Sequence, residues 1–322
     1  MALLPAFAVD GGRGPASMFR GMLWASTSGA TGVVQAGDLR VTPLSTPGTA
    51  VNVGPGGALA ASRYTGASRA ETYGVVNDAT IPVAIPPTSS GAGRTDYIIL
   101  RVDDWHFSGS PQPDDPLGAA YCSFERVTSL TGINYPYVPL AKITIPASTG
   151  TITSSMITDL REVALPRTQR VLRPNALIWS EKETLTSKTG EYFPNAGGAQ
   201  TVPIPSWATR VKIRADWFMV RVPKGAVDGR IWVGFGDWNG TRWGAPATQS
   251  QEFAFNNADT GGDCRQSWAV VDDLYIPANL RGRDVHFQMW GKVFSTVRPV
   301  IDGISGSSLD LLFEEVADPS DS

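Results

Sequence analysis

The sequence is short of the residues on which many binding and catalytic frameworks depend. Its 322 residues include only two cysteines and two histidines, which excludes a disulfide-stapled scaffold and the usual Cys/His zinc sites. Charged residues make up 18% of the chain, against about 25% in an average protein, so a helical bundle or coiled coil is excluded as well. No apolar run approaches the roughly 18 residues of a membrane helix. We therefore expect no metal, no cofactor and no membrane insertion.

The charge balance gives no reason to expect a nucleic-acid partner. The formal net charge is −3, whereas a non-specific nucleic-acid binder is usually basic. Residues 1–10 hold a short apolar run without a basic stretch before it, which makes a poor signal peptide. Cys122 and Cys264 lie in different halves, and we expect both to be buried free thiols. This favours assembly in a reducing cytoplasm.

Glycine, proline and tryptophan are plentiful but unevenly distributed, and they divide the chain. Eight of the ten tryptophans follow residue 173, so two differently built domains explain the sequence better than one. We predict an N-terminal domain of residues 1–173 and a C-terminal domain of residues 174–322. Residues 1–60 form a Gly/Pro-rich leader that would not build a core alone. Helical spacing predicts a short helix near 154–163, and the arginines from Arg167 to Arg173 suggest a stiff linker.

Most of the second half alternates apolar with polar residues, the period of an antiparallel strand with one buried face. From Arg210 to Trp217, every second residue is apolar and the residues between are charged. Other strand-like segments there are 183–192, 201–204, 231–235, 252–255, 268–276, 285–290 and 309–314. The pattern predicts a mainly β protein whose C-terminal domain is an antiparallel β-sandwich of the jelly-roll kind. In the first half, the runs 97–102, 121–127 and 140–145 predict a β-rich domain.

No sequence motif of a known catalytic class is present. A GxSxG nucleophile elbow and a P-loop are both missing, and Gly234–Gly240 is one residue too long for a dinucleotide fingerprint. His106 and His286 fall in different predicted domains and cannot form a local triad. Adjacent aspartates on one strand point to opposite faces, so they do not form the carboxylate pair of a glycosidase. We expect no enzymatic activity.

Three tryptophans within twelve residues are the most informative local feature. The candidate site consists of Trp232, Asp237, Trp238, Asn239, Arg242 and Trp243. Exposed indole rings stack on the C–H faces of sugars, and acid, amide and guanidinium groups hydrogen-bond sugar hydroxyls. The cluster therefore predicts a glycan-binding site in a loop at one end of the sandwich. The alternative is that these rings pack an inter-subunit contact or cover a sandwich edge.

Three stretches of the first half together resemble a known family. Their order, Tyr97–Asp104, Tyr137–Pro146 and Met156–Arg161, resembles the N-terminal domain of minor tail proteins in long-tailed phages of actinobacteria. The Ile-Thr-Asp-Leu-Arg run within the third resembles the point where phage tail-fibre and baseplate proteins leave their docking domain. Gln200–Pro205, leading into 211–213, resembles phage tail β-sandwich domains in general pattern. No catalytic residues of a family carry over.

The resemblance implies a structural virion protein of the tail tip or baseplate, made in the host cytoplasm. Its N-terminal domain would attach to other tail proteins, and its C-terminal sandwich would face outward toward a host cell-wall glycan. We expect a homotrimer or a symmetric ring, with residues 1–60 contacting neighbours. Two alternatives remain: a tail-associated glycan hydrolase, and a purely structural assembly component without receptor binding.

Overall fold

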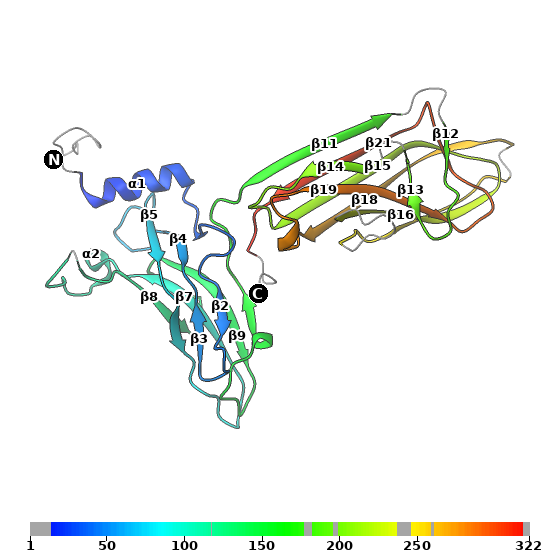
Figure 1. Cartoon of the computed structure of the whole chain (residues 1–322). Coiled ribbons are helices and arrows are strands. Elements are labelled where there is room, and N and C mark those ends of the chain that lie inside the picture. Colours follow the sequence, from blue (N-terminus) through cyan, green and yellow to red (C-terminus); the bar gives the residue numbers. More distant parts are fainter. Residues whose placement is uncertain are drawn as a thin grey trace. The chain divides into compact units, whose positions relative to one another are not determined.

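The computed structural model describes residues 14–116, 118–176, 182–195, 199–236, 246–258 and 261–317. The fold is mainly β, as predicted, with several antiparallel sheets and two α-helices among these residues. The described chain divides into two compact units (Figure 1). Unit 1 contains residues 14–166 and 316–317, and unit 2 contains residues 167–315. None of the described helices is long and apolar enough to cross a membrane.

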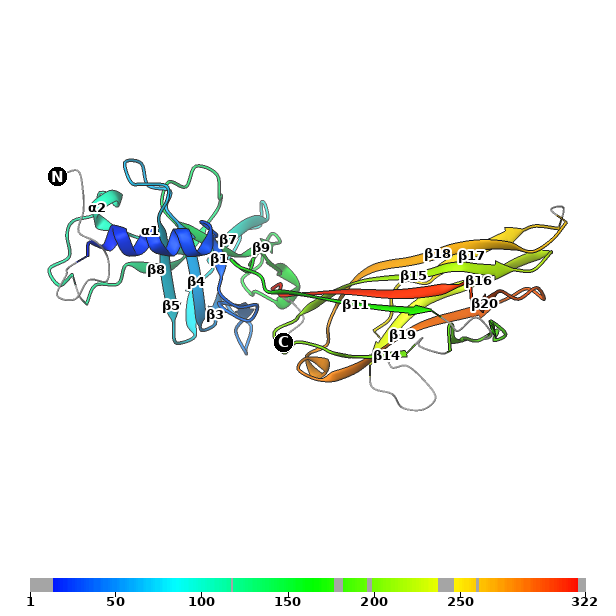
Figure 2. The ribbon, with the colours of Figure 1, turned by 90° about the horizontal axis from the view of Figure 1, so that it is seen from above.

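Unit 1 is built from three small antiparallel sheets. Its helices are α1 (Ala16–Thr27) and α2 (Trp105–Ser108), and its strands are β1 (Gly32–Val33), β2 (Val41–Pro43), β3 (Ala50–Val53), β4 (Gly56–Ala61), β5 (Thr72–Asn77), β6 (Ile81–Ala84), β7 (Arg94–Val102), β8 (Cys122–Val127), β9 (Tyr137–Ile145) and β10 (Ile157–Asp159). The sheets have the strand orders β1-β4-β5, β2-β3-β6 and β10-β9-β7-β8. Helix α1 packs on β5 (Figure 2). The three strand-like runs predicted in the first half are β7, β8 and β9.

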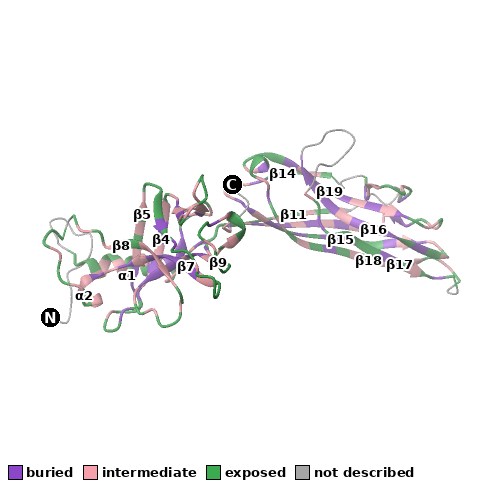
Figure 3. Cartoon of the chain, turned by 90° about the horizontal axis from the view of Figure 1, so that it is seen from below, coloured by how far each residue is buried: buried purple, intermediate pink, exposed green. Residues whose placement is uncertain are grey.

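The core of unit 1 draws on its first strands as well as on β7 and β9 (Figure 3). Val33, Leu39, Val51 and Val53 are buried in it beside Leu140. Residues from β1 onward thus do not form a core alone but pack into the core of their own unit, together with β7 and β9. Valines that alternate along β3 place one face of a short strand inward, so even a Gly-rich segment supplies core side chains.

The predicted helix near 154–163 is wrong. Residues Ser154–Met156 form one 3₁₀ turn, and the chain continues as β10, which pairs antiparallel with β9. Val163 forms an isolated parallel bridge with Val33. The β-branched residues of β10 favour the extended pairing that β9 offers, which overrides the helical spacing of the apolar residues.

Arg161 closes this end of unit 1. Its guanidinium binds the Asp159 carboxylate, with Nη2 2.7 Å from Oδ2. Its Nη1 donates to the backbone carbonyls of Ala36 at 3.0 Å and Asp38 at 2.7 Å. The side chain is only 1% exposed. One buried arginine thus ties the segment after β10 to the loop before β2.

Unit 2 contains long strands in two facing sheets. Its strands are β11 (Thr168–Ala176), β12 (Lys182–Thr184), β13 (Glu191–Tyr192), β14 (Ala199–Pro203), β15 (Arg210–Val222), β16 (Ala226–Gly236), β17 (Gln251–Asn256), β18 (Cys264–Tyr275), β19 (Asp284–Val293), β20 (Val300–Asp302) and β21 (Gly306–Glu314). The first sheet has the order β11-β21-β15-β18, and the second has the order β14-β19-β16-β17. Strands β12, β20 and β13 are short additions at the edges and ends.

These two orders define a jelly roll. Numbered from one to eight along the chain, the principal strands are arranged 1-8-3-6 in one sheet and 2-7-4-5 in the other, which is a double Greek key. The alternation predicted for β15 is confirmed, because Val211, Ile213, Ala215 and Trp217 are all buried in the core between the sheets. Phe287 contributes from β19 opposite. The predicted sandwich is thus the observed architecture.

The predicted boundary between residues 173 and 174 is displaced. It falls inside β11, which pairs with β21 along its whole length. Arg167–Arg173 therefore consists of one residue before β11 and the first part of that strand, and it is not a linker. The structural division lies between Pro166 and Arg167. Arg167 also pairs with Glu315 through two contacts of 2.8 Å, and the Glu315 N–H donates to the Arg167 carbonyl at 3.0 Å. The chain therefore enters and leaves unit 2 side by side.

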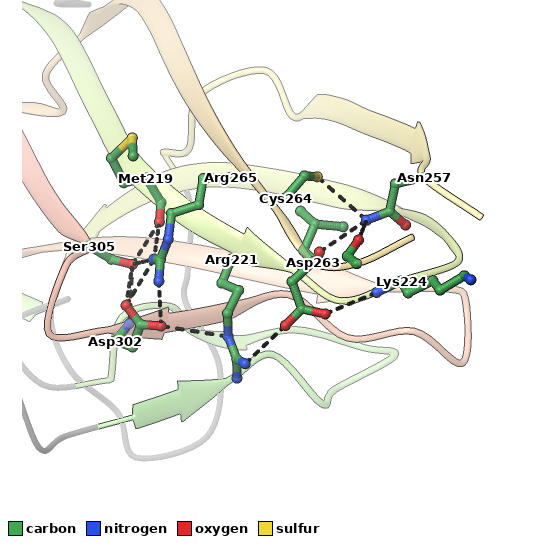
Figure 4. A network of polar contacts seen from close by, with 11 residues as sticks. Met219, Arg221, Lys224, Asn257, Asp263, Cys264, Arg265, Asp302 and Ser305 are labelled. Carbon is green, nitrogen blue, oxygen red and sulfur yellow. Dashed lines mark hydrogen bonds and ion pairs between the residues drawn. The ribbon is translucent and has the colours of Figure 1, made fainter. Parts of the chain in front are cut away.

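A polar network supports a bulge in β15 (Figure 4). Met219 sits in the left-handed region with φ 53°, and its carbonyl accepts hydrogen bonds of 2.8 Å from both Arg265 and Ser305. Arg265 also binds the Asp302 carboxylate through two contacts of 2.9 Å.

The prediction of two buried thiols is wrong. Cys264 of unit 2 is half-buried, and Cys122 of unit 1 is exposed.

The network predicts acid sensitivity in unit 2. Hydrogen bonding from Arg265 holds the pKa of Asp302 below its ordinary value of 3.8, so its ion pair stabilises the fold above that pH and is lost as the pH falls below it. We expect Asp302→Asn to lower the free energy of unfolding by about 1–3 kcal/mol at neutral pH and by much less near about pH 2. Urea unfolding followed by tryptophan fluorescence measures this.

Asp263→Asn is the matched control for that measurement. Asp263 belongs to the same network through Arg221 but is 44% exposed, so its loss should cost less than about 1 kcal/mol. An effect of Asp302→Asn that is equally large at both pH values would show that the charge of Asp302 contributes nothing to the stability.

Candidate functional site

The predicted site residues divide between described and undescribed parts of the chain. Trp232 lies in β16, on the outer face of the second sheet of unit 2. The other five lie outside the described residues: Asp237, Trp238, Asn239, Arg242 and Trp243. Among the described residues, the surroundings of Trp232 form the candidate site.

Trp232 forms a parallel stack with a second tryptophan, Trp290. The two residues face each other in the register of β16 and β19. Their ring centroids are 5.8 Å apart and their planes differ by 8°. Tyr192 meets the Trp290 ring edge-on, with centroids 4.8 Å apart. Three aromatic rings from three strands thus form one apolar platform on the sheet surface.

A groove of about 420 Å³ runs beside this platform. Besides Trp232, its described lining consists of Thr189, Ala247, Thr248, Gln249, Ser250 and Lys292. The hydroxyl, amide and ammonium groups of this set are hydrogen-bonding partners for a polyhydroxylated ligand. An aromatic floor flanked by such groups binds a molecule that has both apolar C–H faces and hydroxyls.

The wall before β17 is fixed to β16 by backbone hydrogen bonds. Phe235 N–H donates to the Pro246 carbonyl at 3.1 Å, and Thr248 N–H donates to the Val233 carbonyl at 2.8 Å. The Thr248 hydroxyl in turn accepts from Val233 N–H at 3.0 Å. Residues 246–250 therefore extend the sheet next to Trp232, which makes this side of the groove rigid.

The opposite wall is the loop before β13. An added Cβ at Gly190, where φ is +132°, would lie 2.9 Å from Cη2 of Trp232, so glycine is required for this close approach. Backbone N–H of Ser187 donates to the Glu191 carboxylate at 2.8 Å. The loop continues into Phe193, whose carbonyl accepts from the buried Trp217 indole at 2.5 Å. A core tryptophan thus fixes the chain that carries Thr189.

The electrostatics of the groove suit a neutral or weakly acidic ligand. Lys292 Nζ lies 6.0 Å from the centre of the Trp232 ring. None of the lining residues within the described ranges is acidic, so they supply no pair of carboxylates for acid–base hydrolysis. On the same face of β19, Gln288 is 1% exposed, and its Oε1 has no hydrogen-bond donor among the described residues.

Of the predicted site residues, Trp232 lines the groove; Trp290, Lys292 and residues 246–250 were not among those predicted from the sequence. A signal for the first two was present, because Trp290 and Lys292 occupy the polar register of a strand whose alternate residues are buried. Their cross-strand partner depends on the order of the sheet, which local alternation does not specify. No group of three metal-ligating side chains occurs among the residues that the structure describes.

Comparison with known proteins gives remote structural likenesses. No protein-family model and no curated protein matches the chain. The VP2 subviral particle of infectious bursal disease virus aligns at 12% identity and TM-score 0.25, covering 92% of this chain and 77% of that one. The Gx strain of the same virus aligns at 12% identity and TM-score 0.23, with coverages of 89% and 74%. Dimeric latent PorU from Porphyromonas gingivalis aligns at 9% identity and TM-score 0.29, covering 89% of this chain and 21% of PorU. These alignments establish neither a family nor a function.

Proposed function

We propose that the chain is a non-enzymatic structural protein of a phage tail tip or baseplate whose jelly roll binds a glycan of the host surface. The observation that carries the glycan part is the parallel pair Trp232 and Trp290 beside a hydroxyl- and amide-lined wall. The Trp232 indole lines the groove and offers an apolar ring to the C–H face of a sugar, and the parallel Trp290 ring supports it. The flanking groups then hydrogen-bond the hydroxyls at the ring edge.

The tail location is supported by the sequence resemblance of the first half to minor tail proteins. In this proposal unit 1 attaches to neighbouring tail proteins, and unit 2 presents the groove. Several copies in a trimer or ring would engage a repetitive cell-wall polymer together, so a shallow groove of modest affinity gives firm attachment. The absence of acidic side chains from the described lining favours attachment over hydrolysis.

A binding assay with actinobacterial cell-wall polysaccharide tests the proposal. We expect the chain to bind this polysaccharide without releasing reducing ends. Trp232→Ala should weaken binding about tenfold or more, by analogy with base–aromatic stacking, which contributes roughly 1–3 kcal/mol. Calorimetric titration gives the affinity, and circular dichroism verifies that the variant remains folded.

Tyr275→Ala is the control, because Tyr275 is an exposed aromatic residue on β18, in the other sheet of the same unit. It should leave the affinity unchanged. Equal binding by Trp232→Ala and the parent chain would remove the groove from consideration. Failure of the parent chain to bind would refute glycan recognition, and release of reducing ends would point to the hydrolase alternative.

A further inference from the structure

Unit 1 contains a cavity of about 320 Å³ that is separate from the groove proposed to bind the glycan. It lies where α1, β5, α2 and the residue before β8 meet. The side chains that matter for its chemistry are Arg20, Tyr73, Asp104, Trp105, His106 and Tyr121. Three of these are large aromatic side chains, and one is a carboxylate. The cavity therefore combines ring faces with one carboxylate and one guanidinium.

Asp104 is held in place as the N-cap of α2. Its Oδ1 accepts from the His106 N–H at 3.1 Å, and its Oδ2 accepts from the Tyr73 hydroxyl at 2.9 Å. Burial raises the pKa of Tyr73, so this hydroxyl stays a neutral donor at physiological pH. The hydroxyl therefore orients the carboxylate without cancelling its charge.

The buried charges around the cavity do not balance. Arg20 Nε lies 2.5 Å from Glu71 Oε2, and Arg20 Nη1 lies 3.5 Å from Asp104 Oδ2. The three side chains are 16%, 9% and 12% exposed, respectively. His106 Nδ1 lies 3.3 Å from Asp104 Oδ1, and a neutral imidazole there adds a hydrogen bond but no charge. One guanidinium then faces two carboxylates, which leaves one negative charge in a poorly hydrated place. Such a charge is costly unless a further cation approaches it.

The aromatic rings that line the cavity can make cation–π contacts with such a cation. Arg20 already lies over Tyr73, with its guanidinium carbon 5.1 Å from the ring centre. Trp105 and Tyr121 line the same cavity, and Trp105 packs against His106 with centroids 3.7 Å apart. A positive group among such rings gains cation–π attraction, most strongly where water is excluded. An anion would instead meet the excess negative charge.

We propose that this cavity binds an alkylammonium group. The Asp104 carboxylate provides the counter-charge, and Trp105 and Tyr121 provide the ring faces around the N-alkyl groups. The group can come from a free small quaternary amine or from a lysine side chain of a partner protein. Both sources present a cationic nitrogen on an alkyl chain; the quaternary amine has four N–C bonds and the lysine ammonium has one.

Calorimetric titration of the full chain with paired probes tests this inference. Choline represents the free quaternary amine, and its uncharged carbon isostere 3,3-dimethylbutan-1-ol isolates the contribution of charge. Nα-acetyl-lysine methyl amide represents a protein side chain. We expect choline or the lysine amide to bind about tenfold or more tightly than the isostere, and the stronger of the two identifies the source.

Asp104→Asn should reduce the affinity for the cation about tenfold or more, because it removes the charge while keeping an N-cap of the same size. Its neighbour Asp103→Asn is the matched control. Asp103 is 35% exposed, faces Arg101 and does not line the cavity, so affinity should stay unchanged. Trp105→Leu gives a second variant, which should also weaken binding. Equal binding of choline and its isostere, no binding of either cation, or full affinity in Asp104→Asn would overturn the inference.

Discussion

Arg161→Met should lower the free energy of unfolding of unit 1 by about 3–5 kcal/mol. The arginine is almost completely buried, and it satisfies the Asp159 carboxylate and the carbonyls of Ala36 and Asp38 at once. Its removal leaves the Asp159 carboxylate without its counter-charge, with the Arg161 backbone N–H still donating to it at 2.9 Å, and two carbonyl oxygens without this donor. The cost of these unpaired groups greatly exceeds that of losing an exposed ion pair.

Hydrogen exchange of peptides from β7 and β9 reports on unit 1 directly, because these strands form the centre of its core. Arg161→Lys keeps the charge but loses the forked geometry, so its effect should be intermediate. Arg69→Met, at an exposed position of the same unit, should change stability by less than about 0.5 kcal/mol. A loss below about 1 kcal/mol in Arg161→Met would mean that Arg161 does not hold the two segments together.

Trp217→Ala should destabilise unit 2 by a comparable amount, about 3–5 kcal/mol. Trp217 is fully buried between the sheets, so truncation leaves a cavity that a rigid sandwich fills only in part. Trp217→Phe retains much of the volume but removes the donor to the Phe193 carbonyl, and it should cost about 1–3 kcal/mol. Urea unfolding followed by tryptophan fluorescence measures both, because eight of the ten tryptophans follow residue 173.

The phenylalanine variant also links the core to the groove. The hydrogen bond to Phe193 fixes the loop that carries Thr189 beside Trp232, so Trp217→Phe should weaken glycan binding at a temperature where unit 2 is folded. Val271→Ala, an exposed position on β18, should alter neither property. A Trp217→Ala variant as stable as the parent would show that the Trp217 side chain does not stabilise the core of unit 2.

Most of what could be predicted about unit 2 came from the alternation of apolar and polar residues along single strands. In β15 the period of two is complete from Val211 to Trp217, and the buried face follows from a single strand without knowledge of its neighbours. The strand order could not be read in this way. The pairing of β11 with β21 joins residues about 140 positions apart, and the sequence of neither strand indicates which strand it pairs with.

The wrong prediction of a helix near 154–163 also arose because a local pattern does not specify the pairing partners of a segment. Met156, Leu160 and Val163 have helical spacing, yet β10 pairs with β9 and Val163 bridges to Val33. These partners lie outside any local window. Helix α1 went unrecognised because its sequence is rich in small residues and leaves large apolar side chains such as Phe19 and Met22 exposed, which weakens the amphipathic signal.

The candidate site was predictable to the extent that it is local. Trp232 stood out because a large ring occupied the polar register of its strand. The rest of the groove comes from β19, from residues 246–250 and from the loop before β13, which meet only after the sheet has formed. The sequence therefore pointed to the floor of the groove, and the topology of the sheet brings its walls together.

The adjoining ends of unit 2 have a consequence for how such a protein can diversify. Because Arg167 and Glu315 are joined by a backbone hydrogen bond and a forked ion pair, the whole jelly roll is an insert with its two ends already in contact. A gene segment encoding a different domain can replace residues 167–315 with almost no gap to bridge. Under the proposed function, the ligand specificity could then change by recombination while residues 14–166 stay the same.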